Sequence, residues 1–505
     1  MVDLSSLAID PEVLKLIPVS TALELSVLPL SLKNDTVIVA MPEMFRRQLV
    51  ADIQFLLGKK VKPVPVPREI LVTAIHWFYG TDKASSGEHL EPYPLSFSSI
   101  RERELRLPGL VSDASAVTLA NRLISSAIRF AATDVHIEPF QHAFRVRYRI
   151  DGVLHEALQL SIDKGISVIG RFKRIANLQI EETQRPQAGR LQVRRDERTI
   201  PIRLTTVPTD FGERCVLRLL DRSRLELDLA NLGFEDRDFK LFQQALHSPS
   251  GLILVAGPEG SGKITTLYAA LTYLNRSDIS ITTIEDPVEF DLPNINQMSV
   301  QPEIGLTYPG ALRAILLQDP NVILVGELRD RETAGLAIRA ALSGHLVLST
   351  VHTTDAPSAI GRLRDMGIEP FLIASSLRMV VAQRLVRELC PRCRILLAPH
   401  PDQIRELALP LGAKQHFFGS KGCPACHYFG YSGRTGVFEV LQVGSSLAEL
   451  ISQGGPISVL RQETRSGGMR TLRQEALSKA RRGETSLDEV IRETPRAAVE
   501  RPRQD

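Results

Sequence analysis

The chain has 505 residues, of which 43% are hydrophobic and 24% are charged, and its formal net charge is +3. This is the composition of an ordinary globular protein of about three to four domains, and so small a charge favours neither a nucleic-acid-binding nor a membrane-binding protein. No apolar run approaches ~18 residues, and the first residues do not resemble a secretory signal, so we expect a cytoplasmic protein without a transmembrane helix. In that compartment the five cysteines are more typical of metal ligands than of disulfides.

Residues 1–80 are expected to form a small domain of strands and helices. Asp10 and Pro11 stand in the order of a helix cap and a first helical residue. Two strands are predicted around a turn, at 27–32 and 36–41. Two helical segments are predicted after them, at 55–58 and 70–80. No residue here carries evident chemistry, so we interpret this segment as a docking domain.

Residues 81–113 are rich in Ser, Pro, Glu and Arg and are interpreted as a linker. A second domain is predicted over 114–230, because two amphipathic helical segments there accompany several alternating strands. Asp151 and Gly152 mark a tight turn between two of these strands. Arginines recur on the strands, either as a solvated face or as ligands of a triphosphate, and the spacing leaves both open: Arg145, Arg147, Arg149, Arg190, Arg203, Arg214 and Arg218.

Residues 231–388 alternate between strand and helix patterns, which predicts a parallel sheet covered by helices. A buried strand over 251–256 is followed by a G-x-x-x-x-G-K loop and a helix, the context of a phosphate-binding loop. Its predicted nucleotide-binding residues are Gly257, Pro258, Glu259, Gly260, Ser261, Gly262, Lys263, Ile264 and Thr265. The position after Lys263 should carry a hydroxyl that ligates Mg²⁺. Ile264 has none, and Thr265 is rotated by about 100° along the helix.

Three further strands of this domain end in polar side chains, and the carboxyl ends of parallel strands line the ligand crevice of an open α/β sheet. One ends in Glu285, Asp286 and Glu289, one in Glu327, and one in His352 with His345 before it. Glu327 is suited to orient an attacking water or to hold Mg²⁺ through water. Together with the loop, these strand ends predict a nucleotide-hydrolysing site.

Residues 389–435 contain two C-x-x-C pairs, formed by Cys390, Cys393, Cys423 and Cys426. Such pairs are typical of a structural Zn²⁺ held by four thiolates. Cys215 lies far away in a predicted strand and is expected to be a core residue. Residues 436–488 are predicted to be helical, and 489–505 to be a disordered tail.

The motifs in chain order include IDPEVLKLIP, DVHIEPF, RVRYRIDGVL, RPQAGR, GERCVLRLLD, GPEGSGK, TIEDPVE, LQDPNVILVGELRD, GHLVLST and HTTDA. With the paired C-x-x-C, they make the chain similar to the assembly ATPases of the type II secretion and type IV pilus biogenesis family, in its secretion or extension branch. The resemblance implies an α/β fold class. A RecA-like P-loop parallel-sheet domain would follow a PAS-like α+β domain and a small N-terminal α+β domain, with a zinc-binding insertion and a helical C-terminus.

The resemblance also implies a homo-hexamer that hydrolyses ATP with Mg²⁺ and binds Zn²⁺, at the cytoplasmic face of the inner membrane. Its partners would be a membrane platform protein and a membrane-anchored protein with a cytoplasmic domain, and no nucleic acid. Glu327 would be the catalytic carboxylate next to Gly326 of the Walker B segment. The remaining catalytic residues that the resemblance implies are Glu285, Arg190, Arg203, Arg313 and His352, with His345 in the same histidine box.

Four positions depart from the family pattern: Ile264, Leu317, Asn321 and Ala188. They replace a threonine, an arginine, an acid and an aspartate. The chain is therefore interpreted as a working ATPase motor or, alternatively, as a member that binds nucleotide but hydrolyses it poorly in a structural or mixed-ring role. A nucleic-acid translocase that shares the P-loop is disfavoured, because the net charge is small and only 5% of residues are aromatic.

Overall fold

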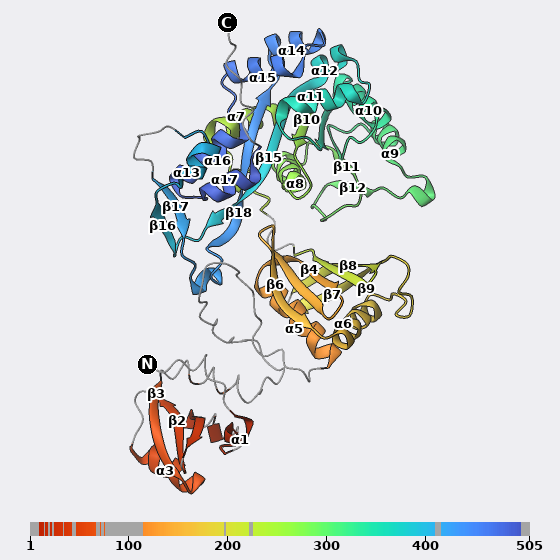
Figure 1. Ribbon diagram of the computed structural model, residues 1–505. Helices are drawn as coiled ribbons and strands as arrows, with labels where there is room; N and C mark the ends of the chain where they lie inside the picture. Colours follow the sequence, from red (N-terminus) through yellow and green to blue (C-terminus); the bar gives the residue numbers. More distant parts are fainter. Residues whose placement is uncertain are drawn as a thin grey trace. The chain divides into compact units, whose positions relative to one another are not determined.

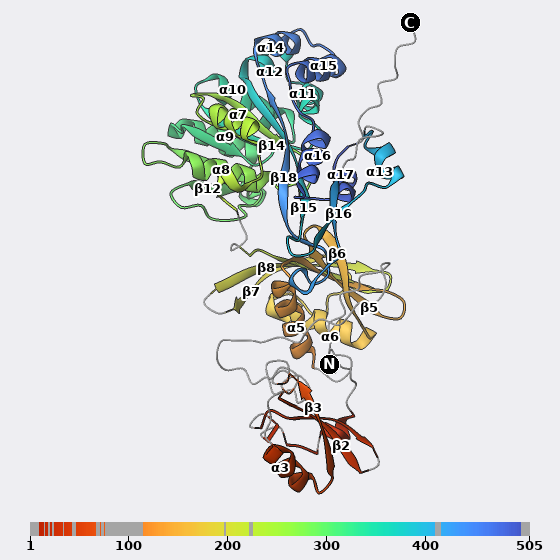
Figure 2. The ribbon, with the colours of Figure 1, turned by 90° about the vertical axis from the view of Figure 1, so that its left-hand side faces the viewer.

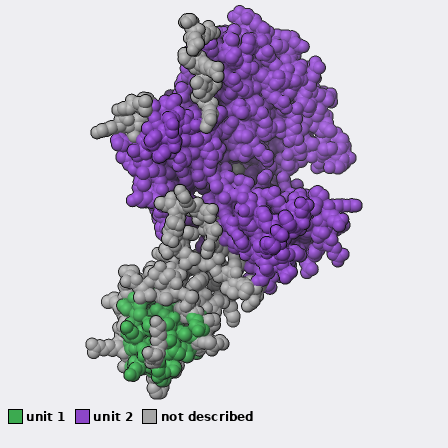
Figure 3. Space-filling view, in the orientation of Figure 1, with its two compact units in different colours: residues 1–103 green, residues 104–505 purple. Residues whose placement is uncertain are grey.

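The structure is a computed structural model of the whole chain. It describes residues 115–195, 198–221, 226–409 and 416–495, together with parts of the first 75 residues: 10–14, 16–18, 21–22, 25–33, 35–42, 47–66, 71 and 75. The chain divides into two compact units, residues 1–103 and residues 104–505, coloured green and purple in Figure 3. Each unit has its own hydrophobic core.

The first unit contains a three-stranded sheet in the order β1-β2-β3. β1 and β2 form the predicted antiparallel hairpin, and β3 pairs in parallel with β2 after a crossover through α3. β3 was not predicted because Pro63 and Pro65 lie within it, and proline is tolerated only where a strand lies at the edge of a sheet, as β3 does. The elements are α1 (Pro11–Leu14), β1 (Leu28–Lys33), β2 (Thr36–Pro42), α3 (Arg47–Leu57) and β3 (Lys60–Val66).

The second unit begins with a six-stranded antiparallel sheet in the order β6-β5-β4-β9-β8-β7. Two amphipathic helices, α5 and α6, cover one face and form a core with the inward-facing residues of the strands. The hydroxyl of Ser115 caps α5 by accepting from the N–H of Thr118. The elements are α5 (Ala116–Arg129), β4 (Ala132–Pro139), β5 (Phe144–Ile150), β6 (Val153–Leu160), α6 (Ile162–Ile175), β7 (Gln187–Arg195), β8 (Arg198–Thr209) and β9 (Gly212–Leu219).

The largest sheet has seven strands in the order β12-β11-β13-β14-β10-β15-β18 (Figure 1). The six strands from β12 to β15 are parallel, and β18 closes the edge in an antiparallel pair with β15. The strands are β10 (Gly251–Ala256), β11 (Ile281–Glu285), β12 (Asn296–Ser299), β13 (Val322–Val325), β14 (Leu346–Val351), β15 (Leu377–Leu389) and β18 (Tyr431–Gln442).

Helices cover both faces of this sheet, so the central strands are apolar on both sides. Along β10, Leu252 and Leu254 pack with α9, α10 and α11, whereas Ile253 and Val255 pack with α7 and α8. These elements and the turns between them are η3 (Leu229–Asn231), α7 (Asp236–Leu246), α8 (Lys263–Leu274), η4 (Pro302–Ile304), α9 (Tyr308–Ile315), η5 (Leu316–Gln318), α10 (Arg331–Leu342), α11 (Ala356–Asp365) and α12 (Pro370–Ser376).

The C-terminal part packs against the long antiparallel pair of β15 and β18, with α16 and α17 alongside it (Figure 2). The buried carboxylate of Glu439 on β18 accepts from the N–H of Ala356 at 2.8 Å and of Leu472 at 3.2 Å, and so caps α11 and α16 together. The elements are β16 (Arg394–Leu397), α13 (Pro401–Glu406), β17 (Phe417–Ser420), η6 (Pro424–Cys426), α14 (Ser445–Ser452), α15 (Ile457–Ser466), α16 (Leu472–Arg482) and α17 (Leu487–Glu493).

The predicted α/β class is confirmed, with a parallel-sheet domain that follows two smaller sheets. The exact domain borders stay a prediction. The linker predicted over 81–113 lies outside the described residues, as do most of the predicted helical segment at 70–80 and residues 496–505 of the tail predicted over 489–505. The start of that tail was wrong, because residues 489–493 belong to α17. Within the described ranges, no helix has the length and apolar character needed to cross a membrane.

Candidate nucleotide-binding and metal-binding sites

The loop between β10 and α8 encloses the side chain of Lys263. Its ammonium group donates to the carbonyl oxygens of Gly257 at 3.0 Å and of Pro258 at 2.9 Å, and the residue is only 8% exposed. Burial lowers the pKa of Lys263, and the nearby carboxylate of Glu327 acts in the opposite direction. Gly262 has a left-handed φ of 87° at the start of α8. The lysine is thus held inside a glycine loop at a helix N-terminus, the arrangement that binds phosphate.

Strand β15 supports this loop from behind. The side-chain oxygen of Gln383 accepts from the hydroxyl of Thr266 on α8 at 2.7 Å. A Cβ atom at Gly257 would lie 2.7 Å from the carbonyl oxygen of Gln383, and one at Gly262 would lie 2.8 Å from its amide nitrogen. Gly257 therefore needs glycine because it lies so close to the backbone of β15, and Gly262 needs glycine because its φ of 87° is left-handed.

Three strand ends meet around the carboxylate of Glu327, two residues beyond β13. One oxygen accepts from Nε of Arg329 at 2.6 Å, and the other lies 3.1 Å from Nε2 of His352, which follows β14 directly. Arg329 also donates to Asp286, just after β11, at 3.3 Å. Because β11, β13, β14 and β10 are neighbours in the sheet, these groups share one edge with the lysine loop.

Glu285 at the end of β11 is buried and points into the domain. Its carboxylate accepts from the hydroxyl of Tyr268 on α8, from Thr283 at 2.6 Å and from Gln297 at 3.3 Å. Burial raises the pKa of Glu285. The hydroxyl of Tyr268 in turn accepts from the N–H of Glu289 at 3.3 Å. Glu285 thus links the helix of the lysine loop to the acidic segment that follows β11.

Two other predicted residues lie apart from this cluster. Arg313 on α9 forms an ion pair with Glu332 on α10. His345 lies just before β14, where its Nδ1 is 2.8 Å from the carbonyl oxygen of Pro320, so it is at the opposite end of that strand from His352. The histidine box is therefore divided between the two edges of the sheet.

Five of the seven predicted arginines of the antiparallel sheet form ion pairs within it. They lie on the face away from α5 and α6, where β4 presents two buried carboxylates. Glu138 pairs with Arg145 at 3.4 Å, Arg147 at 2.7 Å and Arg214 at 3.3 Å, and Asp134 pairs with Arg149 at 3.5 Å and Arg218 at 2.9 Å. For these five the solvated-face interpretation has to be modified, since each guanidinium group contacts one of two buried carboxylates.

Arg190 and Arg203 differ from the other five. They lie opposite each other on β7 and β8, and neither forms an ion pair with any described carboxylate. The next residue in the same row is Arg218. Its hydrogen bond to Asp134 raises its pKa, and the carboxylates of Glu259 and Glu289 in the P-loop domain act in the same direction. The row therefore places two guanidinium groups without a described ion-pair partner beside an arginine whose pKa is affected by Glu259 of the lysine loop.

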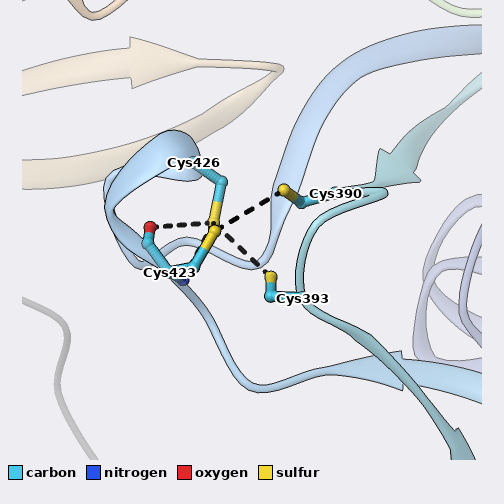
Figure 4. Close-up of side chains that lie close together, drawn as sticks. All are labelled: Cys390, Cys393, Cys423 and Cys426. Atoms are coloured by element: carbon cyan, nitrogen blue, oxygen red, sulfur yellow. Dashed lines mark hydrogen bonds between the residues drawn. The ribbon is translucent and has the colours of Figure 1, made fainter.

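The four predicted cysteine ligands converge on one point (Figure 4). Their sulfur atoms all lie within 4.8 Å of one another, with contacts of 3.8 to 3.9 Å between neighbours. Thiolates at Zn–S distances of ~2.3 Å in a tetrahedron lie about 3.8 Å apart, so the set fits such an ion. Backbone N–H groups of Cys423 and Gly430 also point at the sulfur of Cys426, both at 3.3 Å, as they do around a thiolate.

The loop that carries Cys423 and Cys426 also contacts the antiparallel sheet and its helices. The aromatic ring of Phe429 packs against the core of that domain. The other contacts join Phe130 to His427 with ring centroids 4.7 Å apart, His155 to Phe429 at 4.4 Å, and a carboxylate oxygen of Asp151 to the N–H of Gly433 at 3.1 Å. A metal that fixed this loop would therefore also stabilise the contact between the two domains.

A family model described as Type II/IV secretion system protein matches residues 110–492, and one described as MshEN domain matches residues 1–85. The chain belongs to the type II/IV secretion system protein family. The resemblance identified from the motifs is thereby confirmed.

Curated relatives agree with this family assignment. The type IV pilus assembly ATPase PilB of Myxococcus xanthus is 38% identical over 98% of this chain and 88% of its own length. The type II secretion system protein E of Dickeya dadantii is 45% identical over 76% of each chain, and the type II secretion system ATPase E of Vibrio cholerae is 44% identical over the same shares.

Solved structures show the same fold. The ATPase DotB of Legionella pneumophila has a TM-score of 0.57 at 18% identity, and covers 77% of this chain and 98% of its own. The DotB of Yersinia pseudotuberculosis has a TM-score of 0.55 at 19% identity, and covers 80% and 99%. At these identities the likeness concerns the fold alone.

The four departures from the family pattern occupy different environments. Ile264 is 42% exposed beside the lysine loop, and Leu317 is 85% exposed after α9. Asn321 accepts from the N–H of Ser280 at 2.7 Å and so joins the starts of β11 and β13. Ala188 lies on β7, two residues before Arg190. Of the four, only the side chain of Asn321 can form a hydrogen bond, because the other three side chains are apolar.

Sequence reasoning did not single out Arg329, Gln383 or Tyr268. Arg329 follows Glu327 by two residues, and its charge beside a strand-end acid was an available signal. Tyr268 was detectable as a tyrosine on the apolar helix after the loop, because a buried tyrosine hydroxyl usually finds a partner. Gln383 gave no local signal, since its partners lie more than 100 residues away in the chain.

Proposed function

We propose that this chain is a Mg²⁺-dependent ATPase that powers assembly of a pilus or pseudopilus for protein secretion. The observation that carries the proposal is the shared sheet edge, where the lysine of a phosphate loop faces a carboxylate suited to orient water. A P-loop binds phosphates, and an acid beside it promotes attack on the terminal phosphoryl group. The names of the curated relatives support the same activity.

In this proposal each group has one task. The loop from Gly257 to Lys263 and the N-terminus of α8 bind the phosphates, and Lys263 exchanges its two carbonyl contacts for phosphate oxygens. Glu327 orients the attacking water, with His352 as its neighbour. When bound, Mg²⁺ would supply charge neutralisation to the phosphates. Because Ile264 has no hydroxyl, the chain would lack one direct protein ligand for this ion.

Three arginines would complete the site, two of them from outside the P-loop domain. Arg190 and Arg203 are suited to approach the phosphates, because their guanidinium groups have no ion-pair partner among the described residues. Arg313 would have to leave Glu332 to take part. Such contributions from a moving domain or a neighbouring subunit fit a homo-hexameric ring, which we propose for this chain by its family resemblance.

We further propose that the four cysteines hold a structural Zn²⁺, which thiolate ligands in this geometry prefer. The proposed domain borders are those of the sequence analysis: 1–80, 114–230, 231–388, 389–435 and 436–488. The proposed location is the cytoplasmic face of the inner membrane. There the first domain would bind the cytoplasmic part of a membrane-anchored protein, and the ring would act on a platform protein.

The alternative is a subunit that binds ATP without hydrolysing it effectively, and the exposed Ile264 and Leu317 favour it. The two are separated by identifying the nucleotide that remains bound after incubation with Mg²⁺ and ATP. We expect ADP in the wild-type protein and ATP in Glu327→Gln, which keeps the loop but lacks the carboxylate. Recovery of intact ATP from both proteins would establish the alternative instead, and recovery of no nucleotide would contradict binding at this loop.

A further inference from the structure

We propose that Arg329 is a positioning residue that fixes the orientation of Glu327 and couples it to Asp286. This inference rests on the proposed function, since it assigns to Arg329 a part in the same hydrolytic site. None of the motif positions used above gives Arg329 a role.

The guanidinium group of Arg329 bridges two carboxylates that follow neighbouring strands. Its Nε lies 2.6 Å from Oε2 of Glu327, and its NH1 lies 3.3 Å from Oδ2 of Asp286. The Nε and NH1 donors of one guanidinium are held in a single rigid plane. A contact to one carboxylate therefore restricts the position of the other.

Glu327 is held from two sides by this arrangement. Arg329 contacts Oε2, and Nε2 of His352 lies 3.1 Å from Oε1, while the side chain of Glu327 stays 18% exposed. The carboxylate is thus oriented by its partners and still reachable by water. Without the guanidinium, Glu327 would keep only the histidine contact and would face the negative charge of Asp286 without the cation between them. The carboxylate would then be expected to rotate.

Arg329 has little part in holding the fold together. Its side chain is 54% exposed, and the side chain of its partner Asp286 is 43% exposed. Ion pairs as exposed as this contribute little to folding stability. The hydrogen bond to Glu327 raises the pKa of Arg329, which favours its charged form. A short and directed contact in an exposed place is better explained by positioning than by stability.

The test compares Arg329→Ala, Arg329→Gln and Arg329→Lys with the wild type in steady-state ATP hydrolysis by the full chain. The matched control is Arg276→Ala. Arg276 is an exposed arginine of the same domain that lies away from the site and forms an ion pair with Asp278, with a distance of 3.1 Å between their charged atoms. We expect kcat to fall about 100-fold in Arg329→Ala and Arg329→Gln, with KM and nucleotide affinity within about twofold of wild type. Lysine cannot bridge both carboxylates in one plane, so Arg329→Lys should recover only part of the rate.

A second measurement separates positioning from a loss of structure. Added guanidinium ion should restore part of the Arg329→Ala rate and should leave the Arg276→Ala rate unchanged. An unaltered kcat in Arg329→Ala, a raised KM at constant kcat, or an inactive variant that guanidinium does not rescue would each overturn the inference. In each of these cases, ATP hydrolysis by the wild type would still support the proposed function. A wild type that binds ATP without turnover would overturn both.

Discussion

Ile264 is the second residue of α8 and follows the phosphate-loop lysine directly. A hydroxyl at this position would give Mg²⁺ one direct protein ligand. A hydrogen bond or ligand that involves a charged group contributes ~1.5–3 kcal/mol, which corresponds to ~10–100-fold in binding or rate. We therefore predict that Ile264→Thr raises Mg²⁺-dependent ATP turnover by a factor in this range. Because the side chain is 42% exposed, threonine fits without repacking.

Ile264→Val is the matched control for this change, because valine has the shape of threonine without the hydroxyl. It should hydrolyse ATP at the wild-type rate. If threonine and valine gave the same turnover, Mg²⁺ would be held by other groups, such as Thr265 or waters on Glu327, and our explanation of the departure would be wrong.

Leu317 provides a second test at the residue scale. It is 85% exposed, so an arginine can replace it without a steric clash. Arginines that contact a transferring phosphoryl group can change the rate by ~10³ or more. We expect Leu317→Arg, combined with Ile264→Thr, to exceed the turnover of Ile264→Thr alone, although effects within one site need not add. Leu317→Gln in the same background should give no gain, because glutamine extends the side chain without a charge.

The spacing of glycine and lysine was sufficient to predict the lysine loop between β10 and α8, since it reflects local backbone geometry. The partners of Glu327 could be placed at one edge of the sheet for a similar reason, because parallel strands share that edge. Arg329 and Tyr268 each gave a signal in the sequence, but their specific partners were not predictable, because side-chain orientation depends on packing between elements far apart in the chain. The same limit explains why five of the seven arginines were not recognised as paired with Glu138 and Asp134.

At the scale of elements, the loop between β17 and β18 has three structural features. It carries two proposed metal ligands, Cys423 and Cys426, it leads into the strand that pairs with β15, and it contacts the antiparallel sheet. A structural Zn²⁺ contributes on the order of 10 kcal/mol to local folding. We predict that Cys390→Ser removes the metal and increases hydrogen exchange over 389–435 and at the Asp151 turn. Nucleotide binding should survive, because the lysine loop joins β10 to α8 and lies outside residues 389–435.

The control for this prediction is Cys215→Ala, which removes a buried thiol that lies outside the cluster. It should retain one metal per chain by elemental analysis. Pure wild-type protein without zinc, with four thiols that react readily, would exclude the metal site. A collapse of nucleotide binding in Cys390→Ser would show that the cysteine region is not a separate unit.

Elements with strong alternation or amphipathic spacing were predicted correctly, because their burial pattern follows their own sequence. β3 was missed because its prolines argue against a strand, whereas its place at a sheet edge permits them. The helical prediction over 436–488 was wrong for residues 436–442, which belong to β18, and the antiparallel pairing of β18 with β15 was not predicted. Its register runs from Gln442 opposite Met379 to Tyr431 opposite Leu389, across the intervening cysteine region, so no local pattern encodes it.

At the scale of the whole molecule, residues 1–103 form a compact unit with a core of its own. Deletion of residues 1–80 should therefore leave the seven-stranded sheet and ATP turnover intact. We predict that the same deletion moves the protein from the membrane fraction to the soluble fraction of cells, because the first domain would bind the membrane-anchored partner. A truncated protein that stayed with the membrane would show that another segment provides this contact.

The most direct test of the central claim is the steady-state rate of ATP hydrolysis by the full-length protein with Mg²⁺, compared with Lys263→Ala. Lys263 is enclosed by the loop and would be the main cation on the phosphates, so its loss should abolish nucleotide binding. We predict measurable phosphate release by the wild type and none above background by Lys263→Ala. Equal rates in the two proteins would contradict the account, because hydrolysis would then arise elsewhere than at this loop.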